Sequence, residues 1–350
     1  MGSLDFYKGK RVFVTGHTGF KGAWLCRVLL KAGATVSGYA LAPETEPNLF
    51  EKSGLDGQIH SVIADITDAD RLVDALAETG PDVVFHLAAQ ALVRRSYREP
   101  ALTYATNVMG TVNVLEAVRQ TPTVKSFVNV TTDKVYENRE WYWGYRENER
   151  LNGFDPYSNS KSCSELVTGS YRRAFFGNPE SPAVSTARSG NVIGGGDYSE
   201  DRIIPDCIHA AAKGREIIVR NPESIRPYQH VLECLSGYLL LAERQYADKT
   251  IAGAYNFGPD EASCVTTGEL ADLFCAAWSE GVTWRAQEDD GPHEANFLKL
   301  DCSKAKAALG WRPCWTIKTA VEKTVEFAKL QSDEERSACM ERQIEEYFYE

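Results

Sequence analysis

Five residues in the middle of the chain carry side chains that could together oxidise an alcohol and then eliminate water: Thr132, Asp133, Lys134, Tyr157 and Lys161. Thr132 supplies a hydroxyl, and the next two residues supply a carboxylate and an amine. Tyr157 and Lys161 have helical i,i+4 spacing, so in a helix both side chains share one face. A cation beside the phenol favours the tyrosinate. A solvated helix face is the plainer interpretation of such a Tyr/Lys pair.

The flanking segments indicate how these groups are positioned. Residues 126–131 are apolar and rich in β-branched side chains, which predicts a buried strand that ends at the hydroxyl, the acid and the amine. Residues 155–176 are predicted to form the helix that carries the Tyr/Lys pair. Because ligands bind at the carboxyl ends of strands in open parallel sheets, both groups should face one ligand site.

A glycine turn follows the first predicted strand, residues 10–15. Gly16, Gly19 and Gly22 precede an apolar-periodic helix that begins near Ala23. Glycines allow a tight turn and close approach to a pyrophosphate, while the start of a helix supplies N–H groups and a favourable dipole. The alternative is a plain strand-to-helix turn, in which the glycines serve only close packing. The strand–turn–helix context favours dinucleotide binding.

The next strands bear on which dinucleotide binds. Residues 35–39 form a predicted second strand, and its end at residues 40–43 offers neither a carboxylate for a ribose nor an arginine for a 2′-phosphate. We therefore expect NAD rather than NADP, although charge does not fix the choice. Residues 61–66 form a third strand, in which Asp65 could accept from the adenine amino group or cap a turn.

The remaining pattern predicts an α/β fold with a doubly wound parallel sheet of the Rossmann type. A fourth strand, residues 82–90, ends in small residues that let a flat cofactor lie close, and a helix over residues 100–119 carries Asn107. After a strand at residues 183–188 the chain should enter a smaller C-terminal α/β substrate lobe. We predict a nucleotide-binding and catalytic domain over 1–190 and a lobe over 191–350, with some segments of the lobe returning to the sheet.

Composition excludes several classes of function. A net charge of −11 without a basic block argues against a nucleic-acid surface. Nine scattered cysteines with no CxxC pair fit reduced thiols, and six dispersed histidines predict no metal site. No apolar stretch is long enough to span a bilayer, and the N-terminus lacks the features of a signal peptide. We therefore expect a soluble cytoplasmic protein that binds no membrane.

With these motifs in view, the chain resembles the extended short-chain dehydrogenase/reductase family over nearly its whole length. Within that family it is similar to the CDP-glucose branch of the nucleotide-sugar 4,6-dehydratases, in which Asp-Lys stands where related dehydratases have Asp-Glu. The strings that carry this resemblance are residues 16–22 (Gly-His-Thr-Gly-Phe-Lys-Gly), 92–97 (Leu-Val-Arg-Arg-Ser-Tyr), 131–134 with 136–141, and 190–197 (Gly-Asn-Val-Ile-Gly-Gly-Gly-Asp).

The resemblance implies oxidation of the glucosyl C4 by NAD, loss of water across C5 and C6, and return of the hydride to C6. It assigns Tyr157 as the base at the C4 hydroxyl, assisted by Lys161, with Thr132 bonded to the same oxygen. Asp133 is then the general acid at the C6 hydroxyl. Lys134 is either the C5 base or an electrostatic stabiliser of the enolate; an ion pair with Asp133 is the plainer role. Glu137 and Glu140 could substitute as base.

The resemblance also implies binding residues and partners. Cofactor contacts are expected at Gly16, Thr18, Gly19, Phe20, Gly22, Asp65, Ile66, Ala88, Ala89, Gln90, Asn107, Tyr157 and Lys161, and substrate contacts at Arg94, Asn191, Arg202, Arg226 and His293. CDP-glucose is the expected substrate, and the product would feed 3,6-dideoxyhexose assembly for surface polysaccharide such as the O-antigen of lipopolysaccharide. A homodimer, or a tetramer, is expected to form through the helices near residues 100–119 and 155–176.

Three alternatives remain open from the sequence. A nucleotide-sugar 4-epimerase would use Thr132, Tyr157, Lys161 and NAD, but it needs no acid and base for elimination, so Asp133 and Lys134 argue against it. A 4,6-dehydratase acting on a dTDP-, UDP- or GDP-linked sugar is excluded by no single residue. A non-catalytic NAD(P)-sensing protein typically lacks the Tyr/Lys pair.

Overall fold

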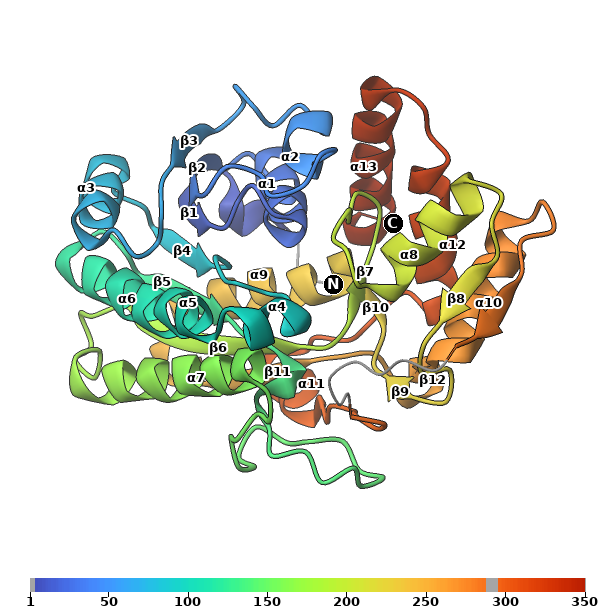
Figure 1. The fold of residues 1–350 in the computed structure, drawn as a ribbon. Helices are drawn as coiled ribbons and strands as arrows, with labels where there is room; N and C mark the ends of the chain where they lie inside the picture. Colours follow the sequence, from blue (N-terminus) through green and yellow to red (C-terminus); the bar gives the residue numbers. More distant parts are fainter. Residues whose placement is uncertain (1–3, 288–294, 350) are drawn as a thin grey trace.

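A seven-stranded parallel sheet forms the centre of the molecule in a computed structural model that describes residues 4–287 and 295–349 (Figure 1). Its strands lie in the order β11-β6-β5-β4-β1-β2-β3. Strands β1 and β4 are neighbours although β2 and β3 lie between them in sequence, so the direction of winding reverses there. Ligands bind at such switch points. The strands are β1 (Arg11–Thr15), β2 (Thr35–Ala40), β3 (His60–Ile63), β4 (Val83–His86), β5 (Ser126–Val130), β6 (Ala183–Ser189) and β11 (Ala254–Phe257).

Both faces of the sheet are covered except at its edge strand β3, because successive side chains of the inner strands enter different cores. In β1, Val12 and Val14 join one core and Phe13 joins the other. The first core is closed by α1 (Phe20–Lys31), α9 (Val231–Ala247), α11 (Ser303–Leu309) and α13 (Asp333–Phe348). The second is closed by α3 (Ala69–Thr79), α6 (Gly110–Gln120) and α7 (Pro156–Ala174). The predicted doubly wound α/β fold is confirmed.

The predicted continuous helix over residues 100–119 is wrong in its middle. The segment consists of α5 (Pro100–Tyr104), a π-helical turn η2 (Ala105–Met109) and α6, which ends at Gln120. Inside the π turn, the Asn107 amide accepts from the backbone N–H of Gln90 at 2.9 Å and donates to the Gln90 carbonyl at 3.0 Å. A π turn of this kind re-aims one side chain out of the regular helical register. Sequence periodicity does not reveal such a contact.

A smaller lobe lies to the right in Figure 1 around a third apolar core. Its helices are α8 (Ile203–Ala212), α10 (Thr267–Trp278) and α12 (Ile317–Ala328), and three two-stranded sheets pair β7 (Val192–Ile193) with β10 (Gln229–His230), β8 (Ile217–Val219) with β13 (Trp284–Ala286), and β9 (Ile225–Arg226) with β12 (Val265–Thr266). Short elements complete the chain: α2 (Leu49–Lys52), α4 (Val93–Arg98), η1 (Leu4–Tyr7), η3 (Asp133–Val135), η4 (Lys249–Ile251) and η5 (Glu261–Ser263).

The chain crosses from the sheet to the lobe after β6 and later returns. Strand β11 pairs with β6, and α9 packs on β5 and β6. Strand β11 and helix α9 come from residues beyond 190, the predicted boundary, and yet they belong to the sheet and its cover. The division into two domains at residue 190 stays a prediction. Among the described residues, none of the helices is both long enough and apolar enough to cross a membrane.

Candidate active site

The acid–amine segment lies at the carboxyl end of β5, as predicted. Strand β5 ends at Val130, and Asp133 opens the single-turn helix η3, whose N-cap is Thr132. The Thr132 hydroxyl donates to Asp133 Oδ1 at 3.0 Å and accepts from the Lys134 backbone N–H at 3.4 Å. Asp133 is buried, and its Oδ2 atom has no hydrogen-bond partner among the described residues. We call residues 131–136 the catalytic turn.

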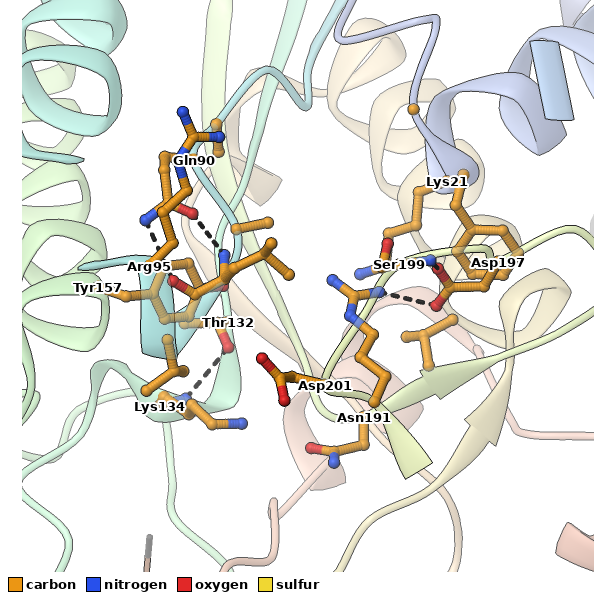
Figure 2. Close-up of a pocket in the computed structure, with 18 of the residues that line it drawn as sticks. Lys21, Gln90, Arg95, Thr132, Lys134, Tyr157, Asn191, Asp197, Ser199 and Asp201 are labelled. Atoms are coloured by element: carbon orange, nitrogen blue, oxygen red, sulfur yellow. Dashed lines mark hydrogen bonds and ion pairs between the residues drawn. The ribbon is translucent and has the colours of Figure 1, made fainter. Parts of the chain in front are cut away.

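Helix α7 brings Tyr157 and Lys161 to this turn. The helix begins with a cap at Asp155, whose Oδ1 accepts from the Ser158 backbone N–H at 2.9 Å, followed by a proline at its first position. Both side chains of the pair are buried rather than solvated. The Lys161 ammonium donates to the Val130 carbonyl at 3.2 Å, at the end of β5. Figure 2 shows Tyr157, Thr132 and Lys134 on the same side of the cleft.

Burial shifts the pKa of both members of the pair. The pKa of Tyr157 rises to about 12, because burial and the charge of Asp133 outweigh the lowering effect of its hydrogen bond with Thr132. Burial, together with the nearby ammonium of Lys21, lowers the pKa of Lys161 to about 8. Lys21 had no role in the sequence prediction; its Nζ donates to Ser189 Oγ at 3.0 Å. These shifts belong to the protein without ligands, and a nearby anion would support both lysine charges.

The ion pair between Asp133 and Lys134, which the sequence left as an alternative role for Lys134, is absent from the described residues. Lys134 is half-buried and lines the cleft, and no carboxylate holds its ammonium there. The two alternative bases have other partners. Glu137 pairs with Arg150 at 2.9 Å, and Glu140 accepts from the backbone N–H of Asn296 at 2.5 Å. Lys134 therefore remains available to act on a ligand.

The glycine turn fits the pyrophosphate of a dinucleotide. Gly16 has a φ of +76°, and a Cβ there would stand 2.7 Å from the backbone nitrogen of Ala88. Only glycine therefore allows β1 and the segment after β4 to approach so closely. Helix α1 begins immediately after Gly19 and points its first N–H groups at the cleft. Of the predicted cofactor residues, Asn107 does not line the cleft, and those that line it are Gly16, Thr18, Gly19, Phe20, Gly22, Asp65, Ile66, Ala88, Ala89, Gln90, Tyr157 and Lys161.

Asp65 and His17, on the adenosine side of the cleft, make contacts within the protein that the sequence did not settle. Asp65 Oδ1 accepts from both the backbone N–H and the hydroxyl of Thr67 at 2.8 Å, so it does cap a turn; its contact with an adenine stays a prediction. His17, which the sequence left without a role, bonds Ser61 Oγ at 2.7 Å. Its ring occupies the space that a side chain at Gly38 would need. Burial lowers the pKa of His17 to about 4, which keeps the ring neutral.

The predicted substrate residues Asn191, Arg202 and Arg226 line the opposite wall of the cleft, where Figure 2 shows Asn191, Asp197 and Asp201, while Arg94 lines the cleft from α4. Arg202 pairs with Asp197 at 2.9 Å, and Arg94 lies 4.0 Å from Asp201. Arg226 is buried and donates to the backbone carbonyls of Ile225 and Ala295, so it is more engaged than an exposed loop arginine. His293 lies outside the described residues. Arg220, which pairs with Asp201 at 3.0 Å, was missed by the sequence prediction.

The cleft between these walls has a volume of about 1790 Å³. Small-molecule sites commonly measure about 300–1,000 Å³, so the cleft has room for two ligands side by side. No cluster of three or more potential metal ligands occurs in the described parts of the chain. The cleft therefore combines a glycine turn suited to a dinucleotide with the buried Tyr/Lys pair, the carboxyl and amino groups of the catalytic turn, and a wall rich in arginine.

Comparison with known proteins identifies relatives along the whole chain. The family model described as GDP-mannose 4,6 dehydratase matches residues 13–324. A CDP-glucose 4,6-dehydratase of Salmonella typhimurium is 48% identical over 349 residues, which cover 98% of this chain and 97% of that protein.

Solved structures share the fold at lower identity. A UDP-glucose 4-epimerase of Thermus thermophilus in complex with NAD has a TM-score of 0.79 at 24% identity, with 91% of this chain and 99% of that chain covered. A dTDP-glucose 4,6-dehydratase of Bacillus anthracis in complex with NAD has a TM-score of 0.77 at 23% identity, with 91% and 96% covered.

Proposed function

Because the chain belongs to the family that the GDP-mannose 4,6-dehydratase model describes, within the extended short-chain dehydrogenases/reductases, we propose that it converts CDP-glucose into CDP-4-dehydro-6-deoxyglucose with NAD. The choice of nucleotide is supported by the 48% identical relative and by the Asp133-Lys134 pair. The choice of reaction rests on the geometry of the catalytic turn.

The buried carboxyl group of Asp133, with one oxygen free of protein partners among the described residues, is the observation that carries the proposal. An epimerase needs a base and a hydrogen-bond donor at C4, which Tyr157 and Thr132 supply. Elimination needs in addition an acid for the departing C6 hydroxyl. Asp133 has one oxygen bonded to Thr132 and a second, buried oxygen with no partner among the described residues. That second oxygen can hold the proton that a leaving hydroxyl requires.

For the oxidation, Tyr157 takes the proton of the C4 hydroxyl and Thr132 bonds the same oxygen. Lys161 holds its positive charge close to the phenol and so favours the tyrosinate. NAD, when bound, accepts the hydride from C4 and returns it to C6. Since the pKa of Tyr157 is raised to about 12, chiefly by burial, the base depends on nearby positive charge to act near neutral pH.

For the elimination, Lys134 takes the C5 proton, which the C4 ketone has made acidic, or stabilises the resulting enolate through its charge. Asp133 gives its proton to the C6 hydroxyl, and the C6–O bond breaks with release of one water molecule. A proton returns to C5 and a hydride to C6, so the sugar ends as the 4-dehydro-6-deoxy form. The cofactor ends in its starting oxidation state.

The binding residues divide between the two walls of the cleft. The glycine turn and the start of α1 would hold the NAD pyrophosphate, with Asn107 and Gln90 fixing the segment beside the nicotinamide. On the lobe wall, Asn191, Arg202 and Arg226 would hold the sugar diphosphate together with Arg94 of α4, since guanidinium groups match phosphate geometry. His293 remains a proposed contact by resemblance only.

A substrate panel tests the proposal directly. The purified protein would be incubated with CDP-glucose, dTDP-glucose, UDP-glucose and GDP-mannose, with and without NAD, and the products weighed by mass spectrometry. Loss of water from CDP-glucose alone is expected. Loss of water from another nucleotide sugar would keep the reaction and change the nucleotide. Isomerisation without a change in mass would overturn the dehydratase and favour the epimerase.

We also propose that the protein is a homodimer joined through α5, η2 and α7. Large apolar side chains are exposed along these elements: Leu102, Met109, Leu166 and Phe175. Exposed apolar residues that share one surface commonly mark an interface between protein chains. Light scattering should give twice the chain mass, and Leu166→Glu should shift the protein toward monomer.

We further propose that the reaction takes place in the cytoplasm and supplies 3,6-dideoxyhexose assembly for surface polysaccharide. All nine cysteines are free thiols, and four of them are only partly buried or exposed, which suits a reducing compartment. The proposed product carries a C4 ketone, which activates the neighbouring C3 position for a further deoxygenation. Incubation of that product with a C3-deoxygenating enzyme would test this order.

A further inference from the structure

A buried ion pair behind the catalytic turn has no part in the reaction described above. Glu165 of α7 and Arg188 of β6 have side chains that are 2% and 3% exposed. Arg188 Nε donates to Glu165 Oε1 and Nη2 donates to Oε2, each at 2.9 Å, so the contact is a two-bonded fork. Burying two charges costs desolvation energy, and such pairs are weak evidence for stability. The pair needs another explanation.

The ion pair is bonded to both ends of the catalytic turn. At its start, the Thr131 hydroxyl donates to Glu165 Oε1 at 2.5 Å. At its end, Arg188 Nη1 donates to the Tyr136 hydroxyl at 2.8 Å. Thr132, Asp133 and Lys134 lie between these two anchors. Since the four residues of the network are all buried, water cannot replace the bonds.

The remaining bonds fix the pair itself. Glu165 Oε2 also accepts from the Thr186 hydroxyl at 2.6 Å, and Arg188 Nη1 also donates to the Glu147 carbonyl at 3.1 Å. Both carboxylate oxygens therefore accept two hydrogen bonds each. The attraction between the two charges outweighs the cost of burial, so the pKa of Glu165 is lowered and that of Arg188 is raised. The pair stays ionised throughout the working pH range.

The same pair is attached to the helix that carries the proposed base. Glu165 follows Lys161 by one helical turn and Tyr157 by two, so all three side chains lie on one face of α7. The charge of Glu165 also raises the pKa of Lys161, against the effect of burial. One ion pair thus joins the oxidation residues on α7 to the elimination residues on the catalytic turn.

We infer that Glu165 and Arg188 are positioning residues that hold Asp133 and Lys134 in register with Tyr157, so that the sugar oxidised at C4 is already placed for elimination across C5 and C6. This inference rests on the proposed function. The pair touches neither substrate nor cofactor, and it acts through Thr131 and Tyr136.

Arg188→Lys tests the inference, because it keeps the buried charge opposite Glu165 but cannot form the fork or reach both partners. A displacement of about 1 Å at reacting groups can cost about 100-fold in rate. Elimination should slow by at least about tenfold, while C4 oxidation on α7 slows by less than about threefold. In single turnovers, reduced nicotinamide, followed by its absorbance, should accumulate in the variant and remain transient in the wild type.

Tyr136→Phe is a second variant that leaves the ion pair intact and removes only one anchor of the turn. It removes the hydroxyl that accepts from Arg188 and donates to Asn256, while the stacked contact of the ring with Tyr145 remains. Elimination should again slow more than oxidation, by about three- to tenfold. This variant keeps the inference testable if Arg188→Lys does not fold.

Glu233→Gln is the matched control. Glu233 is a buried carboxylate on α9 that accepts from the backbone N–H groups of Cys314 and Trp315 and from the Tyr347 hydroxyl, away from the catalytic turn. The substitution should lower the free energy of unfolding while leaving the ratio of the oxidation rate to the elimination rate unchanged. Equal slowing of both steps in Arg188→Lys and Tyr136→Phe would overturn the inference. A wild type that dehydrates none of the four nucleotide sugars would instead overturn the proposed function, and the inference with it.

Discussion

The two walls of the cleft are built in different ways. The wall formed by Thr132, Asp133, Tyr157 and Lys161, which we call the sealed side, consists of residues that are at most 9% exposed. The wall formed by Asp201, Arg202 and Arg220, the open side, has side chains between 30% and 45% exposed. On the sealed side, Lys161 is held by a hydrogen bond to the end of β5 and Thr132 by one to Asp133, whereas the arginines of the open side are held by ion pairs with Asp197 and Asp201.

This difference matches what each wall has to do. Reacting groups must stay within about 0.5 Å of their productive positions, which requires partners that do not exchange with water. Groups that capture a charged ligand must give up one partner and take another. Half-exposed ion pairs do so at little cost, because each contributes about 0–1 kcal/mol. The chemistry should therefore be sensitive to changes on the sealed side and tolerant of changes on the open side.

The largest effect is expected from Tyr157→Phe. A positioned acid–base group contributes about 10²- to 10⁴-fold in rate, and this phenol is the only base proposed for the first step, so kcat should fall by about 10³-fold. Single turnovers should show no reduced nicotinamide. Tyr171→Phe, on the same helix and packed against the second core, is the control and should retain kcat within about twofold, since it touches no reacting group. A Tyr157→Phe enzyme with a tenth of the normal rate would exclude the assigned base.

Asp133→Asn should have the next largest effect and should act on one step only. The amide has nearly the shape of the carboxyl group but cannot supply a proton, so dehydration should slow by about 10²-fold. Oxidation at C4 should continue, and reduced nicotinamide should accumulate. The measurement is a comparison of absorbance with water loss in the same reaction. If both steps slow alike, Asp133 supports the geometry of the turn rather than acting as the acid.

A smaller effect should reveal how well the sealed side excludes water. His86 lies behind it at the end of β4, bonded to Thr15 at 2.7 Å and Thr111 at 3.2 Å, and burial lowers its pKa to about 3. The folded protein keeps this ring neutral, whereas the unfolded chain takes up a proton below an ordinary pKa of about 6.5. The stability that His86 contributes is therefore complete above that pH and is lost as the pH falls toward the folded pKa.

Between about pH 7.5 and pH 5.5, the wild type should lose about 1.4 kcal/mol more unfolding free energy than His86→Gln. Urea unfolding at the two pH values measures this difference. His17 and His230 have similarly lowered pKa values, of about 4 and 3, and they remain in the variant. Glu233 works in the opposite sense, because burial raises its pKa to about 7. Both proteins share these groups, so the contributions cancel. Equal pH dependence in both would mean that water reaches His86.

The sequence predicted the parts of the site that local patterns determine. The strand–turn–helix around Gly16 and the helix that presents Tyr157 and Lys161 follow from residue spacing alone, and the fold that they imply is confirmed. The roles of the individual site residues stay predictions.

Contacts between distant residues were not predictable in the same way. Glu165 and Arg188 each look like an ordinary charged residue until α7 and β6 bring them together. Lys21 meets Ser189 across 168 positions of sequence, and the π turn around Asn107 depends on the segment at Gln90. Arg226 was predicted from its neighbours in sequence, which gave no sign of its bonds to backbone carbonyls.

The smallest effect is expected on the open side, from Asp201→Asn. Asp201 is shared by Arg220 at 3.0 Å and Arg94 at 4.0 Å, so its carboxylate competes with the substrate diphosphate for the Arg94 guanidinium. Removing the charge should lower KM by up to about fivefold, the equivalent of about 1 kcal/mol for an exposed pair, and leave kcat unchanged. Salt should reduce the difference, because exposed charges are screened. Asp272→Asn is the control and should change neither constant, because the Asp272 carboxylate on α10 accepts a hydrogen bond from the Trp284 indole and lies outside the cleft. A rise in KM would mean that Asp201 orients the arginines for the ligand, and the open side would then be as preorganised as the sealed side.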